Sequence, residues 1–181
     1  MRRLVAVAVL VLAVALLYRS FFDEETGTGN LTLAAPEPNI GSTAENFTTR
    51  DVEGNTFELS DKGVYVLAFW SPYNQGSNRA RPGFIGVAQE YSEEASFAVV
   101  YVDGEREDRD APYDHLYDLT GRLASHYNVK RVPRLFVVRD GVISWVMDEY
   151  YLGYEKDLKQ EIDDALAQKN QEDPQTALVN D

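Results

Sequence analysis

The sequence predicts an α/β domain in which helices cover both faces of a mixed β-sheet. Two continuous apolar runs of strand length, residues 63–70 and 97–102, have the pattern of strands buried on both faces. Apolar residues recur at helical spacing after each run. Asp140-Gly141, between two further apolar runs, is a typical hairpin turn. A strand–helix–strand unit pairs its strands in parallel and a hairpin adds antiparallel strands, so the sheet is expected to be mixed.

The first predicted element is a small hairpin in residues 47–59, which alternate in polarity around Glu53-Gly54-Asn55. The first apolar strand follows, and then a helix that begins near Ser77, the expected N-cap. Pro82 is expected to kink this helix because proline has no backbone N–H. The buried face of the helix consists of Ala80, Phe84, Val87, Ala88 and Tyr91.

The second half of the chain begins with the apolar strand 97–102 and an acidic loop that contains two arginines. A helix is predicted over about 115–127, with Leu116, Leu119, Leu123 and Tyr127 on one face. Strands 134–138 and 142–147 then form the hairpin. The last helix starts near Tyr154 and buries Leu158, Ile162, Ala165 and Leu166.

Residues 1–22 are predicted to form a transmembrane helix. The stretch from Leu4 to Phe22, with Arg19 reaching the headgroups, nearly crosses a hydrocarbon core of about 30 Å. Arg2 and Arg3 favour the cytoplasmic side, which places the domain outside the cytoplasm as part of a single-pass protein of the cell membrane. The alternative is a signal peptide cleaved near Ala13-Val14-Ala15, which would release a secreted protein.

The remaining boundaries follow from composition. Residues 23–45 are rich in Gly, Thr, Asn and Pro and are expected to form a flexible tether. The folded domain is predicted over 46–169, followed by a polar tail at 170–181. Apolar residues make up 44% of the chain, which is enough for a real core.

Composition also excludes several kinds of chemistry. The chain has no cysteine, so disulfides, thiolate nucleophiles and cysteine–metal sites are impossible. Its net charge is −13 and it has no visible basic patch, so no nucleic-acid partner is expected. The oxygen-rich loop at 103–110 does not have calcium-binding spacing and contains Arg106 and Arg109, so a solvated loop is favoured over a metal site. We expect no metal and no cofactor.

Two stretches resemble a known family. "FELSDKGVYVLAFWSPYNQGSNRARP" and "LASHYNVKRVPRLFVVRDGVISW" are similar to the two signatures of membrane-anchored thioredoxin-like proteins of the redoxin and cytochrome-maturation type. The resemblance covers roughly residues 45–168. It implies a thioredoxin-like three-layer sandwich around a mixed sheet, with Pro133 in the cis form.

The resemblance also assigns roles to single positions. Trp70 and Tyr73 match the aromatic residues that precede the first cysteine of the family, and Asn74 and Ser77 occupy the two cysteine positions. Ala80 stands where several anchored members carry an acid for proton transfer. Thiol exchange requires a thiolate that attacks sulfur, so the usual reaction of the family is expected to be absent here.

The expected site is therefore a binding surface, and whether the protein is an enzyme stays open. In the family, the residue before the cis proline offers its backbone to an extended peptide, and the aromatic residues supply apolar contact. The expected binding residues are Trp70, Tyr73, Asn74, Ser77, Val132 and Pro133. Trp70 and Tyr73 are alternatively core or rim aromatics. A cap is favoured for Ser77 over a nucleophile, because neither His115 nor His126 maps beside it.

The leading hypothesis is a membrane-tethered, extracytoplasmic thioredoxin-like domain without redox activity, which binds a protein or peptide partner or assists assembly. One alternative is an oxidoreductase-family or antioxidant-family protein that acts through the cysteines of a partner. Another is a structural protein of the cell envelope.

Overall fold

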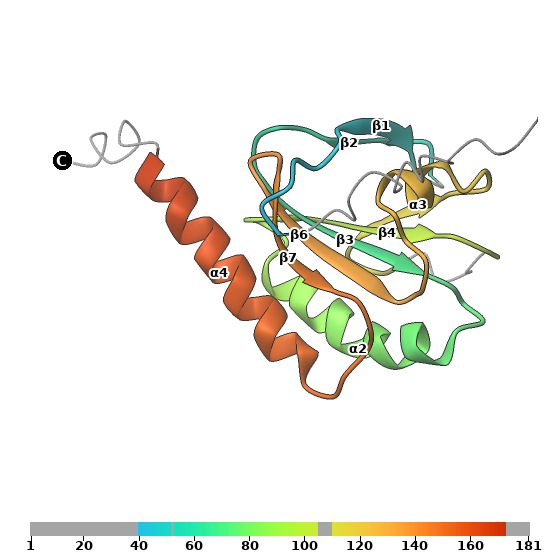
Figure 1. Ribbon diagram of the computed structural model, residues 1–181. Coiled ribbons are helices and arrows are strands. Elements are labelled where there is room, and N and C mark those ends of the chain that lie inside the picture. Colours follow the sequence, from blue (N-terminus) through green and yellow to red (C-terminus); the bar gives the residue numbers. More distant parts are fainter. Residues whose placement is uncertain (1–39, 52, 105–109, 173–181) are drawn as a thin grey trace, which may run out of the picture. The chain divides into compact units, whose positions relative to one another are not determined.

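The computed structural model describes residues 40–51, 53–104 and 110–172 (Figure 1). The elements are β1 (Phe47–Arg50), β2 (Thr56–Leu59), β3 (Val64–Trp70), α2 (Gln75–Glu90), β4 (Ser96–Tyr101), β5 (Asp114–Tyr117), α3 (Arg122–His126), β6 (Arg134–Arg139), β7 (Val142–Met147) and α4 (Tyr154–Glu172). The predicted transmembrane helix at 1–22 lies outside the described residues. None of the helices in the described ranges combines the length and apolar composition needed to cross a bilayer.

Five strands form the central sheet in the order β5-β4-β3-β6-β7. The pairs β3–β4 and β4–β5 are parallel, whereas β3–β6 and β6–β7 are antiparallel. The sheet is therefore mixed, as predicted. Because β7 runs in the same direction as β3, the carboxyl ends of β3, β4, β5 and β7 and the start of β6 all lie at one edge, which we call the carboxyl edge.

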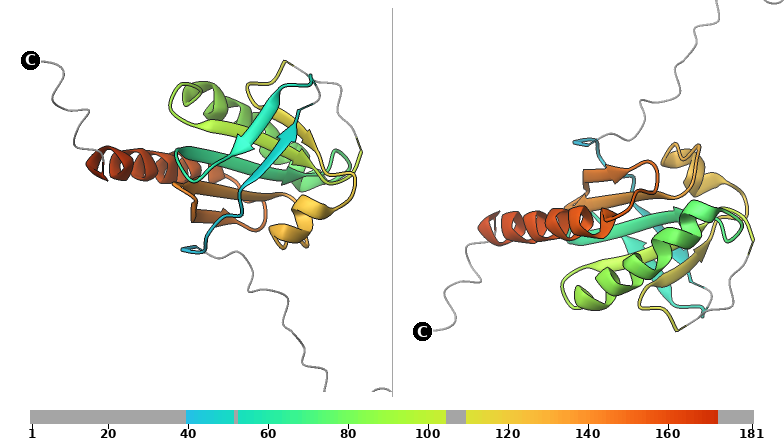
Figure 2. Two further views of the ribbon diagram at one scale, coloured as in Figure 1. Left: turned by 90° about the horizontal axis from the view of Figure 1, so that it is seen from above. Right: turned by 90° about the horizontal axis from the view of Figure 1, so that it is seen from below.

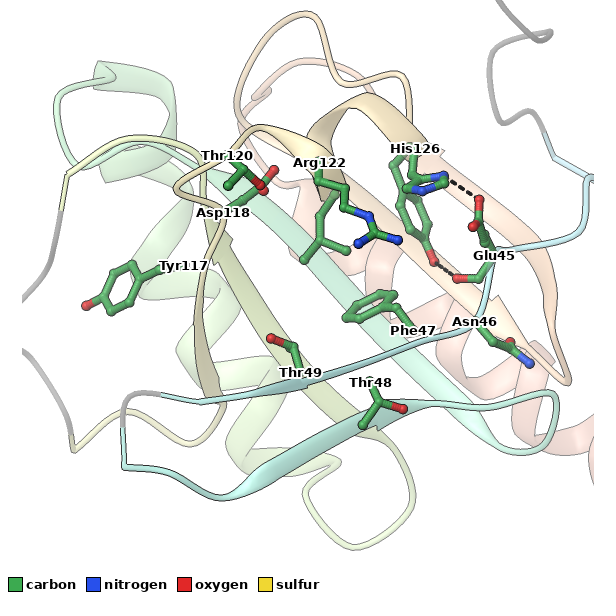
Figure 3. Close-up of a pocket in the computed structure, with 12 residues that line it drawn as sticks. Glu45, Asn46, Phe47, Thr48, Thr49, Tyr117, Asp118, Thr120, Arg122 and His126 are labelled. Atoms are coloured by element: carbon green, nitrogen blue, oxygen red, sulfur yellow. Dashed lines mark hydrogen bonds and ion pairs between the residues drawn. The ribbon is translucent and has the colours of Figure 1, made fainter.

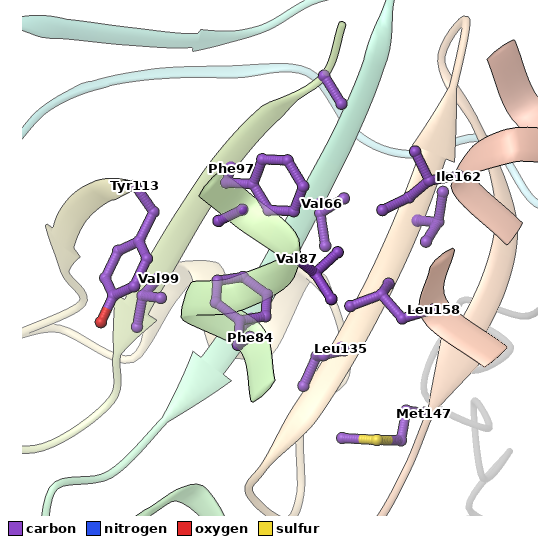
Figure 4. Close-up of a cluster of buried hydrophobic side chains, with 14 of the residues drawn as sticks. Val66, Phe84, Val87, Phe97, Val99, Tyr113, Leu135, Met147, Leu158 and Ile162 are labelled. Carbon is purple, nitrogen blue, oxygen red and sulfur yellow. The ribbon is translucent and has the colours of Figure 1, made fainter. Parts of the chain in front are cut away.

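The two faces of the sheet belong to different hydrophobic clusters. Side chains alternate along β3, so that Val66, Ala68 and Trp70 face α2 and α4 while Leu67 and Phe69 face the other way. Figure 4 shows the first cluster, in which Phe84 and Val87 of α2 meet Leu158 and Ile162 of α4 over the strands. The β1–β2 hairpin and α3 cover the opposite face (Figure 2).

The predicted helix over 115–127 is wrong in its first half. His115 and Leu116 lie in β5, which pairs with β4, and Leu119 is 85% exposed. The spacing of the leucines fits a helix, but Leu116 is buried by strand pairing instead. The helix α3 begins only after Gly121, whose φ of 68° lies in the left-handed region that interrupts a helix.

The hairpin predicted at Asp140-Gly141 is confirmed. Both residues have positive φ, 47° and 74°, as a two-residue turn of type I′ requires. Asp140 Oδ1 also accepts a hydrogen bond from the backbone N–H of Gly63 at 2.9 Å, which ties the turn to the start of β3. The hairpin predicted in 47–59 is present as β1 and β2.

The ordered domain extends beyond the predicted boundaries at both ends. Ile143 of β7 exchanges backbone hydrogen bonds with Gly41 and Ser42, and Thr43 bridges Val142. These residues were expected to belong to the tether, but their pairing protects the first half of the β7 edge strand. At the other end, α4 continues to Glu172.

Candidate functional site

The candidate site is the turn between β3 and α2, at the carboxyl edge of the sheet. Asn74, not Ser77, is the N-cap of α2: its backbone is extended and its Oδ1 accepts the N–H of Ser77 at 2.9 Å. The prediction for Ser77 was wrong because Asn and Ser are both good caps and the sequence offers both three residues apart. Pro82 lies inside α2, and the kink predicted there stays a prediction.

Ser77 is buried inside the first turn of the helix, with 2% of its surface exposed. Its hydroxyl accepts the N–H of Ser71 at 3.3 Å and lies 3.4 Å from Asn74 Oδ1, to which it donates. A serine that donates to an amide oxygen has no base to activate it, so this geometry favours a structural role over a nucleophile. His115 is packed between Tyr101 and Tyr113, and His126 pairs with Glu45.

Pro133 lies directly against the turn. The Val132–Pro133 bond is cis, as the resemblance implied. A Cβ added at Gly76 would lie 2.9 Å from Pro133 Cδ and 3.1 Å from Asn74 Oδ1, so only glycine fits between them without a shift. The structure therefore brings Asn74, Ser77 and Pro133 together, with Val132 half-buried beside them.

The two predicted aromatic residues are placed very differently. Trp70 is 1% exposed and packs edge-on against Phe84 at 5.0 Å, so it belongs to the core and has no surface for a partner. The prediction that Trp70 contacts a partner is therefore wrong, and the side chain is part of the hydrophobic core next to the turn. Tyr73 is 80% exposed and lies over Gly104, where an added Cβ would approach its ring to 2.7 Å. Only Tyr73 is open to contact.

Exposed apolar side chains occur in several loops along the same edge. Six large apolar residues are exposed in the described part of the chain, and four of them, Tyr73, Leu119, Tyr151 and Leu152, lie in loops at the carboxyl edge. Leu152 is 90% exposed. Burial, then the hydrogen bond to Asp157, raises the pKa of Tyr151 to about 12, so its hydroxyl stays neutral.

Arg134 is a site residue that the sequence reading missed. It follows Pro133 directly and is only 6% exposed. Its Nη1 donates to the carbonyl of Asn128 at 3.0 Å, and its Nε lies 3.0 Å from Asp148 Oδ1. It thereby fixes the loop before Pro133 to the loop after β7. The available signal was a charged residue at the start of an otherwise apolar strand.

Metal binding has no support in the part of the chain that the structure describes. No group of three or more His, Asp or Glu side chains there could hold an ion. Residues 105–109, in the middle of the acidic loop, lie outside the described ranges, so the expectation of a solvated loop stays a prediction.

Comparisons with solved structures identify the fold. A putative thiol:disulfide interchange protein DsbE from Chlorobium tepidum aligns with a TM-score of 0.63 at 22% identity, over 71% of this chain and 98% of its own. A putative thioredoxin from Neisseria meningitidis aligns with a TM-score of 0.61 at 22% identity, and the alignment covers 70% of this chain and 91% of the thioredoxin. A secreted Mycobacterium tuberculosis disulfide oxidoreductase homologous to E. coli DsbE aligns with a TM-score of 0.57 at 19% identity, and the alignment covers 65% of this chain and 95% of the oxidoreductase.

These likenesses establish that the domain has a thioredoxin-like fold, as the two sequence signatures implied. The chain differs from a thiol–disulfide enzyme in the feature that carries the chemistry, because it contains no cysteine. No protein-family description matches the chain, and no curated protein matches it either.

Proposed function

We propose that this protein is a redox-inactive, thioredoxin-like binding module that holds a protein or extended peptide at the carboxyl edge of its sheet. The observation that carries the proposal is the intact frame around an altered turn. Asn74 and Ser77 stand beside Pro133 and are hydrogen-bonded to each other, while the apolar side chains of the loops around them remain exposed. Exposed apolar side chains are candidates for a contact surface where they lie next to a site.

The expected mode of binding is addition of an extended segment beside Val132. The backbone of Val132 would supply hydrogen bonds, and Tyr73 would supply apolar contact from the opposite side. Leu152 would extend the contact along the rim. Asn74 and Ser77 are expected to contribute shape rather than chemistry, since Asn74 Oδ1 and the Ser77 hydroxyl are already hydrogen-bonded to each other.

We further propose that residues 1–22 anchor the domain to the outer side of the cell membrane. Support comes from the sequence alone: two arginines, an apolar stretch and an acidic segment from Asp23 to Glu25. Labelling with a membrane-impermeant reagent in intact cells tests the topology. Extraction with alkaline carbonate separates an anchored protein from a secreted one.

Redox assays test the inactivity. The purified chain should reduce insulin no faster than a protein-free blank, because no thiolate is available. The double variant Asn74→Cys with Ser77→Cys should gain measurable reduction, since residues three apart at a helix start lie within disulfide reach of about 4.4–6.8 Å between Cα atoms. Activity above the blank in the parent chain would refute the proposal.

Partner contact is tested by site-specific photocrosslinking in cells. A photoreactive residue in place of Tyr73 or Leu152 should give the same crosslinked partner. The matched control is Val142, which is 39% exposed but lies at the opposite end of the sheet. Equal crosslinking from Val142 would show that the carboxyl edge is not the contact surface.

A further inference from the structure

A second site lies on the face of the sheet that α2 and α4 leave uncovered. A cavity of about 320 Å³ opens between the β1–β2 hairpin and α3 (Figure 3). Its lining comes from residues 45–49, the end of β5 and α3. Small-molecule sites have volumes of about 300–1,000 Å³. The helix beside it, α3, has only 5 residues.

The base of this cavity is apolar and already formed. Phe47 and Tyr127 meet edge-on, with ring centroids 6.2 Å apart, and Leu123 packs against the same cluster. Tyr127 is 2% exposed, and its hydroxyl donates to the carbonyl of Glu45 at 3.0 Å. Tyr127 thus supports the base from within the core, and a flat apolar group could pack on the half-buried side chains of Phe47 and Leu123.

The charges around the cavity are unequally satisfied. Glu45 pairs with Nδ1 of His126 (Figure 3). Asp118 is 4% exposed, and its Oδ2 accepts the N–H of Ala124 at 2.7 Å, so it caps the first turn of α3. Arg122 is exposed to solvent, and it forms no ion pair with a carboxylate within the described residues. Figure 3 shows its guanidinium reaching across the cavity toward Phe47.

We propose that this cavity binds a small organic monocarboxylate with a flat apolar body. The carboxylate takes the two parallel donors of the Arg122 fork, and the apolar body lies on Phe47 and Leu123, which are half-buried. Thr49 is half-buried on the strand face shared with Phe47 and offers a further hydroxyl. A single negative charge is favoured, because one carboxylate matches the one charge of Arg122 and a dianion would be repelled more strongly by Asp118.

The test is an NMR titration of the isotope-labelled full chain in a nonionic detergent, with benzoate as the probe and benzamide as its uncharged isostere. Benzoate should give saturable amide shifts confined to the cavity, in the millimolar range expected of so small a ligand. Benzamide should bind at least about ten-fold more weakly, because it cannot satisfy the guanidinium.

Two arginine variants separate this site from general attraction of anions. Arg122→Gln should reduce the preference for benzoate over benzamide to near unity. Arg79→Gln, which removes an exposed arginine from α2 instead, should leave the preference unchanged. Equal binding of the two probes, a preference that survives Arg122→Gln, shifts outside the cavity, or no saturable shift up to about 100 mM benzoate would each overturn the proposal.

Discussion

The two faces of the central sheet are covered in different ways (Figure 2). One face carries two long helices, α2 with 16 residues and α4 with 19. The other carries two strands of 4 residues each and the 5-residue α3. The long helices bury their apolar faces in the larger of the two core clusters, whereas the cavity beside Arg122 lies between the short elements.

This difference suggests that the two faces contribute differently to the stability of the fold and to ligand binding. Close packing of α2 on α4 leaves no room at their contact: Tyr154 donates to the carbonyl of Ala80 at 2.5 Å, and a Cβ added at Gly83 would collide with Glu155. The cluster on the hairpin face contains fewer buried side chains than the cluster on the helical face. We therefore expect the helical face to carry most of the folding free energy, and the hairpin face to tolerate change.

The largest expected effect comes from removing an aromatic core residue on the helical face. Phe84→Ala should lower the free energy of unfolding by about 3–5 kcal/mol, because Phe84 is fully buried against Trp70 and Phe97. Phe47→Ala on the hairpin face should cost only about 1–2 kcal/mol, because that side chain is half-buried. Urea unfolding of both variants measures the contrast, and equal losses would contradict the comparison.

The comparison becomes sharper at two glycines of the same helix. Gly76→Ala should destabilise by about 1–3 kcal/mol, because the new methyl would press on Pro133 at the site. Gly86→Ala has nothing within 4 Å and should stabilise by up to about 1 kcal/mol through helix propensity. Thermal unfolding of the pair separates crowding at the site from propensity. If Gly76→Ala also stabilises, the turn does not lie against Pro133 as described.

A smaller effect is expected at the cap that starts α2. Asn74→Ala should cost about 1 kcal/mol, because the N–H of Ser77 loses its acceptor. Asn74→Asp replaces the amide oxygen with a carboxylate oxygen, which can accept the same hydrogen bond, so the stability of this variant should remain close to that of the parent chain. Denaturant midpoints with unchanged slopes provide the measurement. If Asn74→Ala leaves the free energy of unfolding unchanged, the cap does not stabilise the turn.

The helical face could be predicted from the sequence because its elements are long and regular. The apolar spacing in α2 and α4 repeats over several turns, and the continuous apolar runs in β3 and β4 have the length typical of doubly covered strands. The hairpin face was predicted less well. Leu116 and Leu119 fit a helix by spacing, yet one is buried by strand pairing and the other is exposed.

The site shows the same division. Asn74, Ser77 and Pro133 could be predicted to lie together because the first signature contains Asn74 and Ser77 and the second contains Pro133. The burial of Trp70 and the anchoring role of Arg134 depend on tertiary contacts that residue type does not encode. The cap at Asn74 is a local contact, but residue type did not decide between Asn74 and Ser77. The cavity at Arg122 was not foreseen, because it lies beside an element shorter than its periodicity suggested.

The smallest expected effect is a pH dependence on the hairpin face. Burial first, and then the charges of Asp51 and Glu53, raise the pKa of Asp114 at the start of β5. An acid whose pKa is raised by folding destabilises the fold once it ionises, so its cost is absent below the unfolded pKa of about 3.9 and present at neutral pH. Asp114→Asn should therefore unfold at a higher urea concentration than the parent chain at pH 7, and the two should converge near pH 3. A variant that is less stable at pH 7 would show instead that the carboxylate of Asp114 stabilises the hairpin face.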